Sequence, residues 1–223
     1  MLPLGDENPT RLTPIVNWTL IVACIAAFVW QSTSGSEFFW LTLYSYGVVP
    51  ARVAAGGGLY TFFTNIFLHG GWSHLLGNML FLFIFGDNIE DCCGHLRYLA
   101  FYLVCGVAAS GLWVITDWGS TYPAVGASGA ISGVLGAYFI FYPSAKIRTL
   151  VSFGYFFRVI RVKAFTMIGL WFAYQFLLAL VPLNTGVAYW AHVGGFVVGI
   201  VLSRLIKPKI RQIPTYSDLD YYR

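Results

Sequence analysis

The chain has 223 residues, of which 58% are hydrophobic, 18% aromatic and only 10% charged, and its mean hydropathy is +0.70. These values exclude an ordinary soluble globular domain and indicate an integral membrane protein that lies in a lipid bilayer. The net charge of +4 comes from Lys and Arg at the ends of apolar segments, so we expect no nucleic-acid partner.

The apolar segments predict an all-α, polytopic fold. A helix needs about 20 apolar residues to cross roughly 30 Å of hydrocarbon. The last charge-free run is long enough for two such helices, and turn residues from Pro182 to Gly186 divide it. We expect six transmembrane helices, at 14–31, 72–90, 97–115, 126–142, 164–181 and 187–206.

The basic residues predict the orientation of these helices. Six spans put both termini on one side, and every Lys and Arg except Arg52 then falls on that side. Because basic loops stay in the cytoplasm, both termini are predicted to be cytoplasmic. The expected parts are a cytoplasmic N-terminal lead (1–13), a six-helix domain (14–206) and a cytoplasmic polar tail (207–223). The first helix lacks the layout of a cleaved signal peptide. The compact form favours a prokaryotic plasma membrane.

Two connections are long. The outer segment 32–60 exceeds most loops, and its aromatic residues suit the headgroup region. Either it is a functional element lying partly in the outer leaflet or it is an ordinary interfacial anchor. The inner segment 143–163 alternates in parts and predicts a hairpin about Gly154, which would orient the protein rather than take part in chemistry.

The cysteines are expected to be reduced thiols. Cys24 and Cys105 lie within spans, and Cys92 and Cys93 lie at a cytoplasmic end, so no disulfide is expected. The spacing of Cys92, Cys93 and His95 is unsuitable for a metal site. We expect no metal and no other cofactor.

The fourth helix carries a candidate nucleophile. Gly126 and Pro143 predict a helix of 17 residues, which rises about 26 Å and is shorter than the bilayer core. Its start should be recessed below the outer surface, with Ser128 in the first turn, where free backbone N–H groups favour a developing negative charge. A serine among glycines in a membrane helix is more often a packing residue, so the other spans must decide.

The sixth helix carries a candidate base. His192, Gly195 and Gly199 share one face, and intramembrane histidines are rare. The fourth helix has glycines at similar spacing, at Gly126 and Gly129 and further along at 133 and 136. Two such faces permit close approach of the helices, which would bring His192 toward Ser128.

The second helix adds polar groups at a similar depth. His74 and Asn78 are four residues apart, on one face near the outer end. A nucleophile, a base and hydrogen-bond donors together meet the needs of acyl transfer. No third acid is evident, since Asp117 lies in the outer loop and is a poor candidate for orienting His192.

The ordered set of motifs resembles a known family. These motifs are His69 with His74 and Asn78, then Gly126 to Gly129, then His192 with its glycines. Over about residues 12–206 the chain resembles the rhomboid intramembrane serine proteases. The resemblance implies a six-transmembrane-helix rhomboid bundle with a recessed central fourth helix and a long, membrane-embedded outer loop between helices 1 and 2.

The resemblance also implies roles for single residues. Ser128 and His192 would form the catalytic dyad, and His74, Asn78 and the Ser128 backbone N–H would stabilise the oxyanion. Structural roles are implied for Glu90, Gly126, Gly129, Gly195 and Gly199. The fifth helix, with Trp171 and Phe172, resembles a mobile helix that admits substrate from the side.

One position departs from some members of that family. They carry an aromatic residue one turn after the nucleophile, stacked on the catalytic histidine, whereas this chain has Ser132. The orientation of the His192 ring is left open, and another aromatic residue is a candidate for packing against it.

The function predicted on these grounds is that of an endopeptidase. It would hydrolyse peptide bonds in or near transmembrane segments of membrane proteins, at small or helix-breaking residues, because an intact helix keeps its carbonyls bonded. The first alternative is a non-catalytic rhomboid-like protein that binds transmembrane helices. The second is a small transporter or channel with His69, His74 and His192 along its path. The sequence determines neither the substrate nor the oligomeric state.

Overall fold

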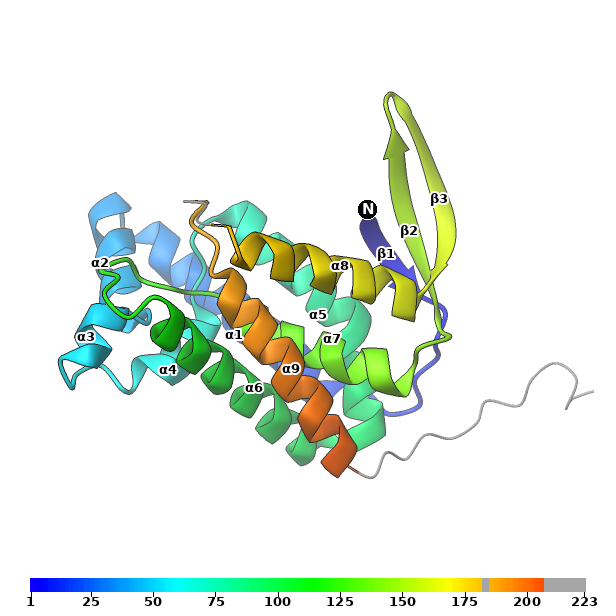
Figure 1. The fold of residues 1–223 in the computed structure, drawn as a ribbon, viewed down its shortest axis with the longest axis horizontal. Helices are drawn as coiled ribbons and strands as arrows, with labels where there is room; N and C mark the ends of the chain where they lie inside the picture. Colours follow the sequence, from blue (N-terminus) through cyan, green and yellow to red (C-terminus); the bar gives the residue numbers. More distant parts are fainter. Residues whose placement is uncertain (182–184, 207–223) are drawn as a thin grey trace, which may run out of the picture.

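The computed structural model describes residues 1–181 and 185–206, and the chain forms a mostly helical bundle with a small sheet at one end (Figure 1). A helix occupies each of the six predicted ranges. These helices are α1 (Ile15–Thr33), α5 (Trp72–Cys93), α6 (His95–Thr116), α7 (Ser128–Phe141), α8 (Ala164–Ala179) and α9 (Tyr189–Leu205). The predicted tail at 207–223 lies outside the described residues.

Among the described helices, α1 and α6 are long and apolar enough to cross a membrane by themselves. The helices α7, α8 and α9 are apolar but shorter, with 14, 16 and 17 residues. A helix of 14 residues rises only about 21 Å, and one of 22 residues about 33 Å. The difference leaves α7 well short of its neighbour α6.

The long connection between α1 and α5 is a folded helical layer. It contains α2 (Ser36–Tyr46), α3 (Pro50–Ala54), α4 (Thr61–Thr64) and the 3₁₀ helix η1 (Asn65–Phe67). Arg52 of α3 donates to the carbonyl oxygens of Tyr44 at 2.8 Å and Gly47 at 2.7 Å, at the end of α2. A cation at a helix C-terminus satisfies carbonyls that have no partner within the helix. This contact explains why one basic residue lies away from all the others.

The opposite end carries a three-stranded antiparallel sheet, with strands in the order β1-β2-β3. Strands β2 (Lys146–Phe153) and β3 (Phe156–Lys163) form the predicted hairpin. Strand β1 (Leu2–Asp6) pairs with β2. The expected all-α fold is therefore wrong for this part of the chain, because the N-terminal lead adds a strand to the hairpin.

Asp6 fastens β1 to the helices. Its Oδ2 accepts hydrogen bonds from Tyr138 Oη on α7 at 2.6 Å and from Asn88 Nδ2 on α5 at 3.0 Å. Burial raises the pKa of Asp6 to about 6, although both hydrogen bonds act in the opposite direction. The attachment of the N-terminal strand should therefore depend on pH.

Glu90 joins three helices near the same end. It is fully buried, and its two carboxylate oxygens accept the backbone N–H groups of Val16 at 2.9 Å and Asn17 at 2.7 Å in the first turn of α1. Its Oε1 also lies 2.5 Å from His95 Nδ1 at the start of α6. A carboxylate is well suited to the N-terminus of a helix. These contacts link α5 to the starts of α1 and α6.

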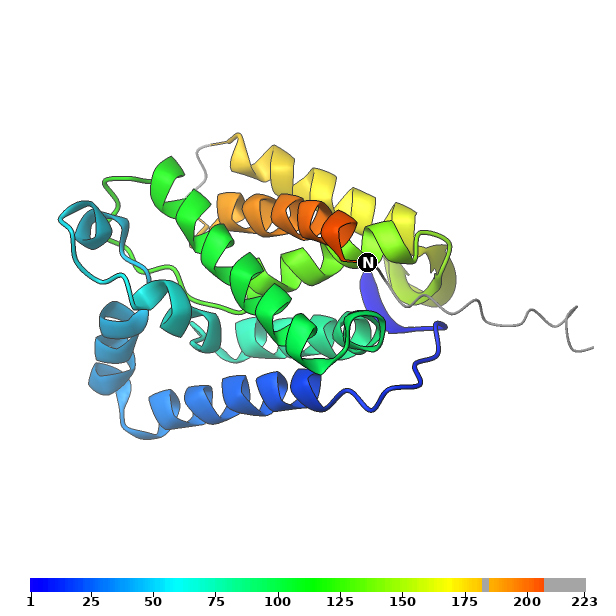
Figure 2. The same ribbon diagram turned by 90° about the horizontal axis from the view of Figure 1, so that it is seen from below.

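Helix α7 lies in the middle of the bundle, between α5 and α9 in both ribbon views (Figures 1 and 2). It contacts α5, α6, α8 and α9, and every residue from Gly129 to Tyr138 is buried. The helix begins at Ser128, two residues later than predicted. Gly126 has φ +131° and donates its N–H to Asn65 O at 2.9 Å, so the chain cannot become helical there.

Glycines bring α7 and α9 together, as predicted. A Cβ atom on Gly195 would collide with the carbonyl oxygen of Gly129, and one on Gly199 with that of Gly133. Backbone therefore packs against backbone along this pair of helices. Gly126 does not belong to this contact, because it precedes the helix and faces α5; the prediction that it shared the glycine face is wrong.

Candidate active site

Ser128 and His192 meet at the N-terminal end of the α7–α9 contact. The Ser128 Oγ and His192 Nε2 atoms are 2.9 Å apart, a hydrogen-bond distance. Ser128 is the first residue of α7 and His192 is the fourth of α9. The glycine contact described above brings the two main chains close together, so two residues 64 positions apart meet at its end.

The other ring nitrogen of His192 is also bound. Gln175 on α8 is buried, and its Oε1 lies 2.7 Å from His192 Nδ1. With the carboxamide oxygen facing the ring, Nδ1 must donate, because a carbonyl oxygen can only accept. The neutral ring then has no proton on Nε2, which accepts the Ser128 hydroxyl proton. This is the tautomer that a general base requires.

Gln175 was not predicted. It occupies the place that an orienting acid would take, so the weak candidate Asp117, which follows the end of α6, does not fill this role. A signal was present in the sequence: Gln175 is a single amide in an apolar helix, one turn from Trp171. The spacing of residues alone did not show that the side of α8 that carries Gln175 faces His192.

Two aromatic rings flank His192. The Trp171 ring centroid is 6.2 Å from that of His192 at an interplanar angle of 32°, and the Tyr189 centroid is 6.3 Å away at 89°. Ser132, which stands where some family members carry an aromatic residue, is fully buried. Its hydroxyl donates to Ser128 O at 2.7 Å. The open question about the ring orientation is thus answered by residues on α8 and α9.

The His74 and Asn78 side chains converge on Gly126, two residues before Ser128. A Cβ atom at Gly126 would lie 2.8 Å from His74 Nε2 and 3.6 Å from Asn78 Nδ2, so only glycine leaves room for both. Gly70 N donates to His74 Nδ1 at 3.4 Å, which leaves the proton on Nε2.

Asn78 Nδ2 is buried and has no hydrogen-bond partner among the described residues. Buried donors without partners are uncommon in native structures and call for an explanation. With the His74 Nε2–H, this amide forms a pair of donors turned toward the start of α7. An oxygen atom placed between these two donors could accept a hydrogen bond from each.

His69 lies behind this pair. Its side chain is fully buried, and its ring centroid is 5.2 Å from that of His74, edge to face. Its backbone N–H donates to Gln31 Oε1 of α1 at 3.3 Å. These contacts make His69 part of the wall that supports His74.

A cavity of about 20 Å³ lies beside Ser128, lined in part by Asn65, Ser110 and Trp113. This space is enough for one water molecule. Ser110 Oγ donates to Asn65 Oδ1 at 3.2 Å, so the cavity wall is partly polar.

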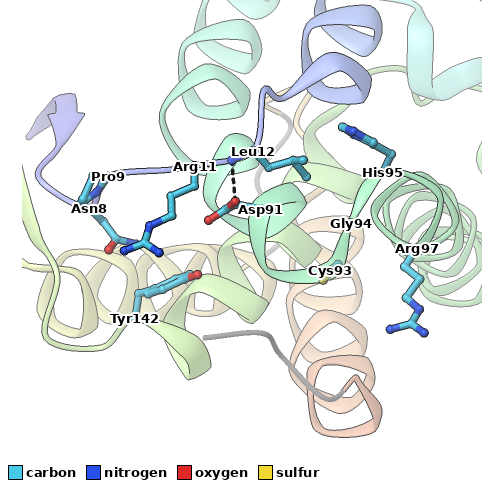
Figure 3. Close-up of a pocket in the computed structure, with 10 residues that line it drawn as sticks. All are labelled: Asn8, Pro9, Arg11, Leu12, Asp91, Cys93, Gly94, His95, Arg97 and Tyr142. Atoms are coloured by element: carbon cyan, nitrogen blue, oxygen red, sulfur yellow. Dashed lines mark hydrogen bonds between the residues drawn. The ribbon is translucent and has the colours of Figure 1, made fainter. Parts of the chain in front are cut away.

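A larger hollow of about 560 Å³ lies at the opposite end of the bundle (Figure 3). Arg11 and Arg97 flank it, and the side chains of Cys93 and His95 point away from each other. It contains none of the predicted catalytic residues.

Comparison with known proteins fits this geometry. A family model described as the rhomboid domain matches residues 56–209. The chain belongs to the rhomboid family. This confirms the resemblance seen in the motifs, and it makes the chain an integral membrane protein whose apolar helices lie in a bilayer.

Several rhomboid relatives are bacterial proteins named as proteases. Rhomboid protease GluP of Bacillus subtilis is 30% identical over 186 residues, covering 83% of this chain and 34% of GluP. Putative rhomboid protease YdcA of the same organism is 32% identical over 131 residues, covering 57% of this chain and 62% of YdcA. Rhomboid protease AarA of Providencia stuartii is 26% identical over 204 residues, covering 83% of this chain and 70% of AarA.

A plant relative, RHOMBOID-like protein 5 of Arabidopsis thaliana, is 36% identical over 96 residues, covering 43% of this chain and 31% of that protein. The chain thus spans 31% to 62% of the lengths of this protein, YdcA and GluP.

Proposed function

We propose that this rhomboid protein is an intramembrane serine endopeptidase that hydrolyses peptide bonds in or near transmembrane segments. The observation that carries the proposal is the 2.9 Å contact between Ser128 Oγ and His192 Nε2, with His192 Nδ1 held at 2.7 Å by Gln175 Oε1. A hydroxyl, a base of the right tautomer and a group that orients the base form a working nucleophile.

In the acylation step, His192 Nε2 takes the hydroxyl proton as Ser128 Oγ attacks the carbonyl carbon. The oxyanion that forms accepts hydrogen bonds from His74 Nε2, Asn78 Nδ2 and the backbone N–H of Ser128. Preorganised donors of this kind are usually a large part of catalysis. His192 then gives the proton to the leaving amine, and an acyl-enzyme on Ser128 remains.

In the deacylation step, water attacks the ester while His192 takes a proton from it. The cavity beside Ser128 has room for one water molecule and polar atoms in its wall. The step then returns the proton to Ser128 and releases the acid. The proposed mechanism requires no metal and no other cofactor.

The proposed membrane arrangement has six spans with both termini in the cytoplasm. The short α7 starts below the outer surface, so that water from outside reaches Ser128. The concentration of Lys and Arg at the sheet end of the bundle supports this orientation. The bacterial relatives support a prokaryotic plasma membrane.

The proposed route for a transmembrane substrate passes α8. Phe172 stacks on Phe196 of α9 with ring centroids 4.2 Å apart, and Trp171 packs near His192. Helix α8 is therefore joined to the site by side chains, whereas α7 and α9 are joined by their backbones. Moving α8 breaks fewer close contacts, which supports Trp171 and Phe172 as the gate.

The experiment compares Ser128→Ala and His192→Ala with the parent chain. In proteoliposomes with a co-reconstituted single-span protein, both variants should lose cleavage, and Ser128→Ala should lose labelling by a serine-directed fluorophosphonate. Ser132→Ala is the matched control: it removes a serine one turn away on α7 and should keep both. Unchanged cleavage in Ser128→Ala would overturn the proposal. A folded parent that neither cleaves nor labels would favour a non-catalytic helix-binding protein.

A further inference from the structure

The β2–β3 hairpin leaves the bundle sideways. Figure 1 shows it running across, rather than along, the direction of the helices and extending beyond α8. β3 ends at Lys163 and α8 begins at Ala164, with no residue between them. The base of the hairpin therefore lies at the depth of the N-terminal end of α8. Strands of 8 residues extend about 26 Å from this base.

The two sides of the hairpin differ in composition. Ile147 and Thr149 of β2 are fully buried, and Thr149 Oγ1 contacts Met167 Sδ of α8 at 3.8 Å. The side that they share faces the bundle. Cross-strand pairing puts Val162, Ile160 and Arg158 on this side as well. Apart from Arg158 and the buried hydroxyl of Thr149, the residues named on the bundle-facing side are apolar.

No described part of the protein covers the tip of the hairpin. Tyr155, Phe156 and Phe157 are 98%, 81% and 69% exposed. Three consecutive aromatic side chains in water are unfavourable, since each buries a large apolar area when it finds a partner. Tyr and Phe of this kind suit the interface between headgroups and hydrocarbon.

The hairpin is strongly basic. Its strands hold five Lys and Arg residues and no Asp or Glu. Lys146 lies directly opposite Lys163, and Arg148 directly opposite Arg161, although like charges in such pairs destabilise a sheet. In the described chain, the only ion pair to these residues is that of Arg161 Nε with Glu7 Oε1 at 2.6 Å. The remaining positive charge suits an anionic surface.

We propose that this hairpin is an interfacial anchor that lies on the anionic inner leaflet of the membrane. Tyr155 and Phe156 at its tip insert among the headgroups, and Arg158, on the same side as Phe156, binds the phosphates of anionic lipids such as phosphatidylglycerol. The four cations on the opposite side add to the attraction toward the anionic surface. The inference rests on the proposed orientation, in which the sheet end faces the cytoplasm. Because β3 has an unpaired edge, the hairpin stays in the interface and does not enter the hydrocarbon. The anchor would fix the inner end of α8.

The test measures the depth of single labelled positions. Phe156→Cys places a label on the bundle-facing side, and Ser152→Cys places one on the opposite side, where Ser152 pairs with Phe157. Both positions are exposed, whereas the four native cysteines are buried. Each variant is labelled with an environment-sensitive fluorophore and reconstituted in nanodiscs of phosphatidylcholine with or without phosphatidylglycerol. The parent chain is the labelling control.

The label at position 156 should be quenched at least threefold more strongly by nitroxides on the lipid chains than the label at 152, and less strongly by iodide in solution. Removing phosphatidylglycerol should reduce this difference. A label at 156 that is as open to iodide in nanodiscs as in detergent would overturn the anchor. Equal quenching with and without anionic lipid would overturn the charge-dependent part. The measurement needs no proteolysis, so failure to cleave a substrate would leave it intact.

Discussion

Gln175→Leu is predicted to reduce catalysis without unfolding the protein. Leucine has a similar size but offers no acceptor to His192 Nδ1, which Gln175 Oε1 holds at 2.7 Å. Gln175 is 7% exposed, so water does not readily replace the lost bond. A hydrogen bond to a group that becomes charged is worth about 1.5–3 kcal/mol, which corresponds to a decrease in kcat of about 10- to 150-fold.

The assay is cleavage of a fluorescent single-span reporter in proteoliposomes, with kcat and KM measured separately. Gln175→Glu is the matched control, because it restores an acceptor at the same place and should recover most of kcat. Thermal unfolding of each variant tests whether the helices stay packed, and the rate of Ser128 labelling by a fluorophosphonate reports activation of the serine directly. A folded Gln175→Leu variant with the kcat of the parent would refute the role of Gln175, as would a folded Gln175→Glu variant with no recovery.

Asn78→Ala should reduce kcat by about 10²- to 10³-fold if its buried amide binds the oxyanion; in the same assay, full activity would remove Asn78 from that role. Gly199→Val should prevent stable folding, because its side chain would meet the Gly133 backbone; a monodisperse, active variant in size-exclusion chromatography would contradict this close contact. The folded-state pKa of Asp6 is raised to about 6, so attachment of β1 should weaken as pH rises through that value and be stronger at pH 5 than at pH 7.5. Hydrogen exchange of residues 2–6, corrected for intrinsic rates, measures this change. Asp6→Asn should remove it, and equal protection of the parent at both pH values would contradict it.

The helices and the approach of Ser128 to His192 could be predicted because both depend on simple spacing. Apolar runs of sufficient length indicate the helices, and glycines every three or four residues indicate the side on which helices approach. The Ser128–His192 pair follows from these patterns. The predicted start of α7 was less accurate, because the positive φ of Gly126 accompanies a contact with η1, which is distant in sequence.

The parts that were missed depend on tertiary contacts. Gln175 is a lone amide in an apolar helix, and nothing local shows that it faces His192. Strand β1 contains Pro3 and Gly5, which strands disfavour, so only its pairing with β2 makes it a strand. The helices α2 and α3 lie in a segment without a clear apolar period, where Arg52 provides contacts that no local pattern reveals.

The division of the site between three helices has a consequence for the timing of catalysis. In the proposed mechanism the nucleophile and the base are on α7 and α9, whose main chains are in contact, but the acceptor that orients the base is on α8. Moving α8 outward by about 1 Å would stretch the 2.7 Å bond beyond hydrogen-bond range. The enzyme would therefore be least reactive while α8 is displaced for entry, and the serine would regain its full nucleophilicity only after the helix has closed behind a bound segment. This dependence of reactivity on the position of α8 would protect lipid esters and proteins that are not substrates from attack while the site is open.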